Sequence, residues 1–246
     1  MTFVLVCGGG FCARSWDRML PFLSGRYIAV DLPGRESRAA VDLRTVTPDD
    51  CARAIVADMD AAEVTDAVLV GHSLAGVIVP RVLAIAPERF KAAICIAAII
   101  PGHGQTVMAT MAPATRAAVV PTIAGGIYRP RGGAGIEMLC NDLDAEQTEF
   151  VIGSRTDESA LLLTEPNDLS GLTPAVPRWY VHLTRDLRVP PDLQERSNTH
   201  WCGYRVSLDT GHMAMVAKPL ELAQLLDGIR RNPLPPERRH APEATT

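Results

Sequence analysis

Residues 67–76 read AVLVGHSLAG, an apolar run that leads directly into a serine between small residues. We expect a strand, a sharp turn and then a helix over the largely apolar residues 77–85. Gly71 and Ala75, two positions before and after Ser73, allow a turn so tight that the serine hydroxyl stands above the end of a sheet. This pattern is typical of a catalytic nucleophile. It also fits a serine that caps a helix or a helix N-terminus that holds an anion, although no P-loop lysine or GxGxxG spacing supports a phosphate site.

A nucleophilic serine needs a nearby base, and the chain holds six histidines. His212 is the best placed, because residues 204–208 read as a strand, residues 209–211 as a turn and residues 219–229 as the next helix. His212 then lies at the exit of a strand, where ligands bind in open parallel sheets. The others are less well placed: His72 beside the serine, His182 inside a strand-like run, His240 in a proline-rich tail, and His103 and His200 in loops.

The acid that orients this base should also leave the end of a strand, and Asp186 follows a strand ending at Thr184 by two residues. The chain order is then Ser73, Asp186, His212, which is the order of α/β-hydrolases and differs from that of other serine hydrolase folds. Asp31 also ends a predicted strand, but it precedes the serine and is the second choice.

Asp186 has a second interpretation, as a solvated carboxylate paired with Arg185 or Arg188. Exposed pairs of this kind are common and weak.

An oxyanion formed on the substrate needs hydrogen-bond donors, usually backbone amides. A buried strand over residues 3–6 ends in Cys7-Gly8-Gly9-Gly10-Phe11, where glycines allow the backbone to approach a ligand closely. We expect the amides of Gly9 and Leu74 to form the oxyanion hole. The glycines would also be present if they only formed a turn between strand and helix.

Together these motifs resemble the α/β-hydrolase superfamily, and within it the branch of plant methylesterases, hydroxynitrile lyases and their bacterial relatives. The resemblance rests on the Gly-rich segment with Trp16 downstream, Asp31-Leu32-Pro33-Gly34, Gly71-His72-Ser73-Leu74-Ala75-Gly76, Thr184-Arg185-Asp186 and Gly211-His212-Met213-Ala214-Met215. That branch begins with the strand that feeds the oxyanion loop, and this chain likewise begins its first strand at Phe3 with no hairpin before it.

The resemblance also separates esterases from lyases. Lyase relatives carry a threonine in the oxyanion loop and a lysine after the catalytic histidine, where this chain has Gly8 and Met213. Ester hydrolysis is therefore favoured, and Gly8, Phe11 and Met213 are expected to contact the substrate. Two positions depart from the pattern: Cys7 replaces a usual histidine and Ala75 a usual glycine.

With 246 residues and 47% hydrophobic composition, the chain can form a single α/β domain. We predict a mostly parallel six-stranded sheet with helices on both faces, spanning residues 1–231, and a disordered tail over residues 232–246. The strands are expected near Phe3, Tyr27, Ala67, Ala92, Trp179 and Tyr204. Helical stretches rather than further strands are expected between about 101 and 176, after a strand ending near Ile100, and we interpret this insertion as a cap.

The cap should roof the catalytic face and shape the substrate pocket. Its candidate lining residues are Met108, Met111, Ile123 and Ile127, although methionine at helical spacing is also common in an ordinary core. Asp144 with Gln147 predicts a capping box that begins a cap helix through Phe150.

The net charge of −4, with mixed signs along the chain, gives no reason to expect nucleic acid or a membrane as partner. No signal peptide is expected, which makes the cytoplasm the default location. The six cysteines lack paired spacing, so we expect free buried thiols and no metal, although Cys7 beside the oxyanion loop has a second interpretation as a reactive thiol. A small-molecule ester is the expected partner, and a homo-oligomer is compatible with the sequence.

The sequence thus predicts a cofactor-independent serine hydrolase that cleaves a small or medium apolar carboxylic ester through an acyl-enzyme. Two alternatives remain open. One is a lyase, lactonase or cyclase-type reaction on the same scaffold with His212 as base, and the other is a protein that only binds a small molecule.

Overall fold

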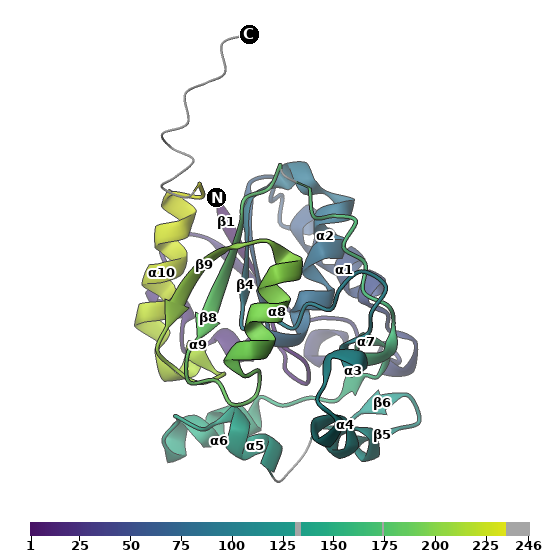
Figure 1. The fold of residues 1–246 in the computed structure, drawn as a ribbon. Coiled ribbons are helices and arrows are strands. Elements are labelled where there is room, and N and C mark those ends of the chain that lie inside the picture. The colour runs from purple at the N-terminus through teal and green to yellow at the C-terminus, as the bar shows by residue number, and fades with distance from the viewer. Residues whose placement is uncertain (131–133, 174, 235–246) are drawn as a thin grey trace.

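The computed structural model describes residues 1–130, 134–173 and 175–234, and its centre is one six-stranded parallel sheet (Figure 1). The strand order is β2-β1-β3-β4-β8-β9, with parallel pairing between all neighbours. The bounds are β1 Thr2–Val6, β2 Tyr27–Val30, β3 Ala67–His72, β4 Phe90–Ile96, β8 Arg178–Leu183 and β9 Tyr204–Leu208. The predicted fold class and the six predicted strands are confirmed.

Helices cover both faces of this sheet. One apolar core joins it to α1 (Pro48–Ala61), α2 (Val79–Ile85) and α8 (Pro191–Trp201), and the other joins it to α9 (Ala214–Ala217) and α10 (Pro219–Arg231). Short 3-10 helices complete the layers: η1 Ala13–Trp16, η2 Leu20–Phe22, η3 Glu36–Arg38, η4 Leu43–Thr45 and η6 Pro87–Arg89. Because the central strands are buried on both faces, they read as continuous apolar runs.

Two elements differ from the sequence-based expectation at their ends. The helix expected from residue 77 begins at Val79, because η5 (Ser73–Val77) continues the tight turn as a 3-10 helix. The strand expected to end near Ile100 ends at Ile96, where Ala97 takes a positive φ of 40°. The chain then turns back, and the Ile99 amide donates to the Ser73 carbonyl at 2.9 Å.

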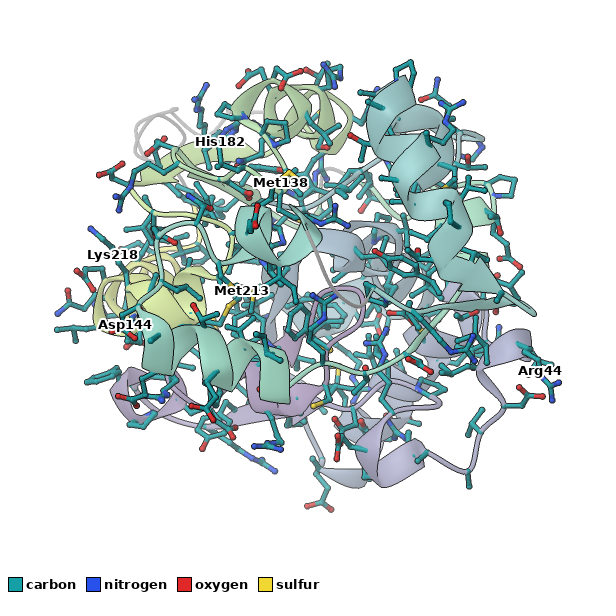
Figure 2. The ribbon with its side chains drawn as sticks, turned by 90° about the horizontal axis from the view of Figure 1, so that it is seen from below. Arg44, Met138, Asp144, His182, Met213 and Lys218 are labelled. Atoms are coloured by element: carbon teal, nitrogen blue, oxygen red, sulfur yellow. The ribbon has the colours of Figure 1, made fainter. Side chains whose placement is uncertain are left out.

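The segment between β4 and β8 lies over the carboxyl ends of the strands (Figure 1). It holds α3 Val107–Thr110, α4 Pro113–Val119, η7 Val120–Thr122, α5 Ala134–Leu139, α6 Ala145–Gly153 and α7 Leu161–Thr164. The expected capping box of Asp144 and Gln147 begins α6. Figure 2 views the molecule from below, the side on which this segment lies. In this view Met138 of α5 lies nearer the middle of the molecule, whereas Arg44 and Lys218 lie at its edge.

The same segment also contains a small three-stranded antiparallel sheet, where only helical stretches were expected. Its strands are β5 Ile123–Ala124, β6 Ile127–Tyr128 and β7 Glu158–Ser159. Each strand is two residues long, too short for an alternating pattern, although Gly125-Gly126 is a recognised two-residue hairpin turn.

The end of α10 is followed by residues 232–234, and the Trp179 indole donates to the Pro233 carbonyl at 2.9 Å. The rest of the tail expected to be disordered, from residue 235, lies outside the described residues. In the described part of the chain, none of the helices has the length and apolar character needed to cross a bilayer.

Candidate active site

Ser73 lies directly after β3, in the left-handed backbone region with φ of 54°. Non-glycine residues rarely take this conformation, and such strain is concentrated at functional sites. The turn needs a glycine at position 71, because a Cβ there would lie 2.5 Å from Val79. The Ala75 methyl group, in place of the usual glycine of the branch, is fully buried in the same turn and packs opposite Gly71. The elbow predicted from residues 67–76 is therefore present.

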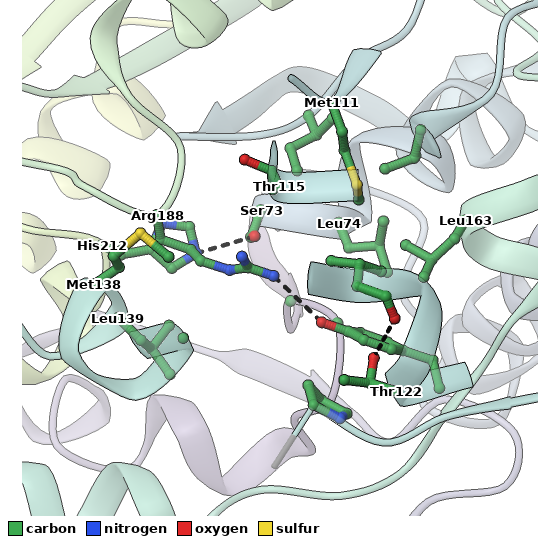
Figure 3. Close-up of a pocket in the computed structure, with 18 of the residues that line it drawn as sticks. Ser73, Leu74, Met111, Thr115, Thr122, Met138, Leu139, Leu163, Arg188 and His212 are labelled. Atoms are coloured by element: carbon green, nitrogen blue, oxygen red, sulfur yellow. Dashed lines mark hydrogen bonds between the residues drawn. The ribbon is translucent and has the colours of Figure 1, made fainter. Parts of the chain in front are cut away.

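The structure brings Ser73, His212 and Asp186 together. Figure 3 shows the contact between Ser73 and His212. His212 Nε2 lies 3.0 Å from Ser73 Oγ, and His212 Nδ1 lies 2.7 Å from Asp186 Oδ2. Ser73 is half-buried, whereas His212 and Asp186 are 1% and 0% exposed. An imidazole between a hydroxyl and a buried carboxylate is the geometry that lets it accept the hydroxyl proton.

The second oxygen of Asp186 is held by its own loop, since Oδ1 accepts hydrogen bonds from the Arg188 and Val189 amides at 2.7 and 2.8 Å. Asp186 is thus no solvated partner of an arginine side chain. Arg185 instead pairs with Asp209, with Nε 3.3 Å from Oδ1.

Asp31, the second choice for the acid, lies elsewhere and has a structural role. Its carboxylate accepts from the Ala13 amide and the Ser37 hydroxyl, each at 2.9 Å.

The glycine-rich loop after β1 packs directly on the serine turn. A Cβ on Gly9 would lie 2.5 Å from the Leu74 side chain, so glycine is required for this approach. A tight turn, closed by the Phe11 amide donating to the Gly8 carbonyl at 3.3 Å, presents the loop to the cavity. Within the described ranges neither the Gly9 nor the Leu74 amide donates to an internal acceptor. Both predicted oxyanion donors are therefore available to a ligand.

A buried ion pair that the sequence did not reveal holds this loop from behind. Arg35 and Glu158 are each 1% exposed and form a close contact. Arg35 also donates to the Phe11 carbonyl at 3.0 Å, while Glu158 accepts from the Gly10 amide at 3.2 Å. Burial is the largest single effect and disfavours a charged Arg35, but the charge and hydrogen bond of Glu158, with contributions from Cys7 and Cys51, together raise the pKa of Arg35. The pair links the segment around β7 to the oxyanion loop.

Cys7, which occupies the usual histidine position of the branch, is part of the same cluster. Its thiol donates to the Phe11 carbonyl at 3.1 Å and lies 3.2 Å from Arg35 Nη1. Burial raises the pKa of Cys7 to about 11. Cys7 therefore remains a thiol at neutral pH, which argues against its interpretation as a reactive thiolate.

A second acid from the same segment holds the turn that precedes His212. The carboxylate of Asp142 accepts from the Gly211 amide at 2.5 Å and from the Thr210 hydroxyl at 2.7 Å. Asp142 lies about seventy residues away in the chain, so no local pattern could have shown this contact.

His72 supports the His212 backbone. Its Nε2 lies 3.0 Å from the His212 carbonyl, and the two ring centroids are 4.5 Å apart. A carbonyl only accepts, so Nε2 carries the proton. Burial, assisted by the nearby His212, lowers the pKa of His72 well below its usual value. His72 is therefore a neutral positioning residue.

Ser73 and His212 open into a cavity of about 430 Å³, a size suited to a small organic molecule (Figure 3). Of the residues expected to contact substrate, Gly8, Phe11 and Met111 line it. Met213 is instead 1% exposed and packs in the core, and Met108, Ile123 and Ile127 do not line the cavity. Sequence reasoning missed these lining residues: Val107, Thr115, Val119, Thr122, Tyr128, Met138, Leu139, Arg155, Leu163 and Arg188.

Among the residues that the structure describes, no group of three or more His, Cys, Asp or Glu side chains is arranged to hold a metal ion.

The chain combines a parallel sheet covered by helices with a serine on a strained turn. This serine is hydrogen-bonded to a histidine that follows another strand. These features are typical of the α/β-hydrolase class. The alpha/beta hydrolase family model matches residues 3–225, and the chain belongs to this family.

Two curated proteins are similar to part of the chain. The carbendazim hydrolyzing esterase of Nocardioides sp. (strain SG-4G) is 29% identical over 130 residues, which cover 52% of this chain and 54% of that protein. The dihydrolipoyllysine-residue acetyltransferase component of the acetoin cleaving system of Pseudomonas putida is 32% identical over 123 residues, covering 48% and 33%. The chain thus spans about half the length of the esterase and about a third of the length of the acetyltransferase component.

Solved structures show the same fold over most of the chain. An extracellular alpha/beta-hydrolase from a Paenibacillus species, described as sharing homology with tobacco salicylic acid binding protein 2, has a TM-score of 0.83 at 20% identity, covering 93% of this chain and 98% of its own. An Arabidopsis methylesterase has a TM-score of 0.72 at 19% identity, covering 94% and 99%. A pyrethroid hydrolase from Sphingobium faniae JZ-2 has a TM-score of 0.71 at 20% identity, covering 95% and 98%.

The buried Arg35–Glu158 pair predicts a large loss of stability when one partner is removed. Glu158→Gln leaves the Arg35 charge buried without its counter-ion, and the free energy of unfolding should fall by about 3–5 kcal/mol. Urea unfolding measures the change. Arg44→Met, which removes an exposed pair with Asp42, should cost far less, because solvent screens this pair. Equal losses in the two variants would contradict the assigned role of the pair.

The neutral, buried His72 predicts a contribution to acid sensitivity. Below about pH 6.5 the unfolded chain binds a proton at this histidine, whereas the folded protein, with its lowered pKa, does not. Stability should therefore fall with falling pH by up to about 1.4 kcal/mol per pH unit from this group alone. His72→Gln should show a shallower decline in urea unfolding between about pH 7 and 5. Identical slopes in the two proteins would refute this expectation.

Proposed function

We propose that the protein is a carboxylic ester hydrolase with Ser73 as nucleophile, His212 as general base and acid, and Asp186 as the group that orients His212. The observation that carries this proposal is the continuous hydrogen-bonded path from Ser73 Oγ through His212 to the buried Asp186 carboxylate, at 3.0 and 2.7 Å, beside a cavity of substrate size. The esterase names of several similar proteins support it.

In the first half-reaction, Ser73 Oγ attacks the ester carbonyl carbon while His212 Nε2 takes the hydroxyl proton. The carbonyl oxygen becomes an oxyanion that the Gly9 and Leu74 amides bind. The tetrahedral species then expels the alcohol, which receives the proton from His212, and an acyl-serine remains.

In the second half-reaction, His212 takes a proton from water as the water oxygen attacks the acyl carbon. Collapse of the second tetrahedral species returns this proton to Ser73 and releases the carboxylic acid. Asp186 orients His212 and stabilises the imidazolium in both steps.

The cavity supports a small or medium substrate whose body is apolar. Its wall is built mainly from aliphatic, aromatic and methionine side chains of the segment between β4 and β8.

Replacement of the proposed nucleophile tests the mechanism. Ser73→Ala should lower kcat toward p-nitrophenyl butyrate by about 10⁴-fold or more, with an unchanged circular dichroism spectrum, because the acyl-enzyme can no longer form. Wild type should form one covalent adduct with a fluorophosphonate probe, located at Ser73 by mass spectrometry, and Ser73→Ala should form none.

His212→Ala is the matched comparison for this experiment. If it abolishes turnover while Ser73→Ala retains it, the reaction is of the lyase, lactonase or cyclase type with His212 as base, and the acyl-enzyme mechanism is refuted. If wild type turns over none of these esters and forms no probe adduct, the chain only binds its ligand.

A further inference from the structure

Arg188 has an unusual place beside the candidate catalytic residues. Its backbone amide donates to Asp186 Oδ1 at 2.7 Å, while His212 binds the other oxygen of the same carboxylate. Its side chain leaves this loop toward the cavity and lines it together with Ser73 and His212 (Figure 3). The cavity therefore contains a fixed positive group on the same loop as Asp186.

The guanidinium has a single protein partner among the described residues, the Tyr128 hydroxyl, to which Nη2 donates at 3.2 Å. Within these residues no carboxylate lies at ion-pair distance from Arg188, and the described cavity wall contains no aspartate or glutamate. Its neighbour Arg185, by contrast, is paired with Asp209 and Asp142 outside the cavity. Arg188 thus retains donor capacity that faces the space for substrate.

A half-buried cation in a largely apolar cavity is costly unless a ligand provides the counter-charge. A guanidinium matches a carboxylate especially well, since two parallel N–H groups can bind both oxygens. The other cation on the described wall, Arg155, stands over the Phe11 ring at 5.7 Å from its centroid. Arg188 is therefore the residue that we connect with a ligand.

We propose that Arg188 binds a carboxylate on the substrate, so that the preferred esters are monoesters of short dicarboxylic acids. This inference rests on the proposed function and names its substrate class. The apolar wall surrounds the hydrocarbon body of such a substrate, and Arg188 binds its charged end. The carboxylate also offsets the repulsion between the guanidinium and the positive charge that His212 acquires during the reaction.

Two esters of equal acyl-chain length test the proposal. The p-nitrophenyl monoester of glutaric acid ends its acyl chain in a carboxylate, whereas p-nitrophenyl pentanoate ends it in a methyl group. Wild type should prefer the glutarate monoester in kcat/KM. Arg188→Met should lower kcat/KM for that ester by about 10- to 100-fold, mainly through KM, and should change pentanoate hydrolysis much less, so that the ratio between the two esters collapses. Arg188→Lys should retain part of the preference, because it keeps the charge without the paired donors.

Arg185→Met is the matched control, because it removes the same charge from the same loop outside the cavity. It should keep the wild-type ratio between the two esters. Equal ratios in wild type and Arg188→Met, or an equal loss in Arg185→Met, would overturn the proposal.

Calorimetry separates this inference from the proposed function. Glutarate should bind to the Ser73→Ala protein and should lose binding when Arg188→Met is added. If no ester is hydrolysed but glutarate binding depends on Arg188, the esterase assignment fails and the carboxylate site stands. If the added Arg188→Met leaves glutarate binding unchanged, the carboxylate site is refuted whatever the esters show.

Discussion

The left-handed turn at Ser73 is the constraint on which the rest of the site depends. A serine at φ of 54° is unfavourable in isolation, and it persists because β3 is paired on both sides, with β1 and β4, and is completely buried. The Ile99 amide holds the Ser73 carbonyl, and Gly71 leaves room for the following helix. The sheet core thus stabilises a backbone conformation that directs one hydroxyl toward His212.

Acids from the segment between β4 and β8 hold two of the loops around this turn. Glu158, paired with the buried Arg35, binds the Gly10 amide beside the oxyanion loop, and Asp142 binds the Gly211 amide directly before His212. The segment is therefore more than a roof over the cavity, because it also fixes the loops that carry the oxyanion donors and the base. A change in its position would alter the geometry of the site as well as the access of substrate.

The sequence alone was sufficient for the sheet and for the contact among Ser73, Asp186 and His212, because each of these features has a local signature. Apolar strand runs, small residues around the serine and the strand-exit positions of the acid and base can all be read from neighbouring residues. The cavity wall could not be read in this way. Met213 follows the base in the chain yet packs into the core, whereas Tyr128 and Leu163, far from any motif, line the cavity.

Contacts between residues that lie far apart in the chain also explain why Cys7 does not disrupt the site. Its small thiol leaves the region behind the oxyanion loop to Arg35, whose guanidinium donates to the Phe11 carbonyl and contacts the sulfur. The buried Arg35 guanidinium requires a counter-ion. Glu158, in the segment between β4 and β8, provides this negative charge. A departure at one position of the family pattern is thus accompanied by an ion pair between residues 123 positions apart in the chain. Only the folded structure shows that these three residues act together.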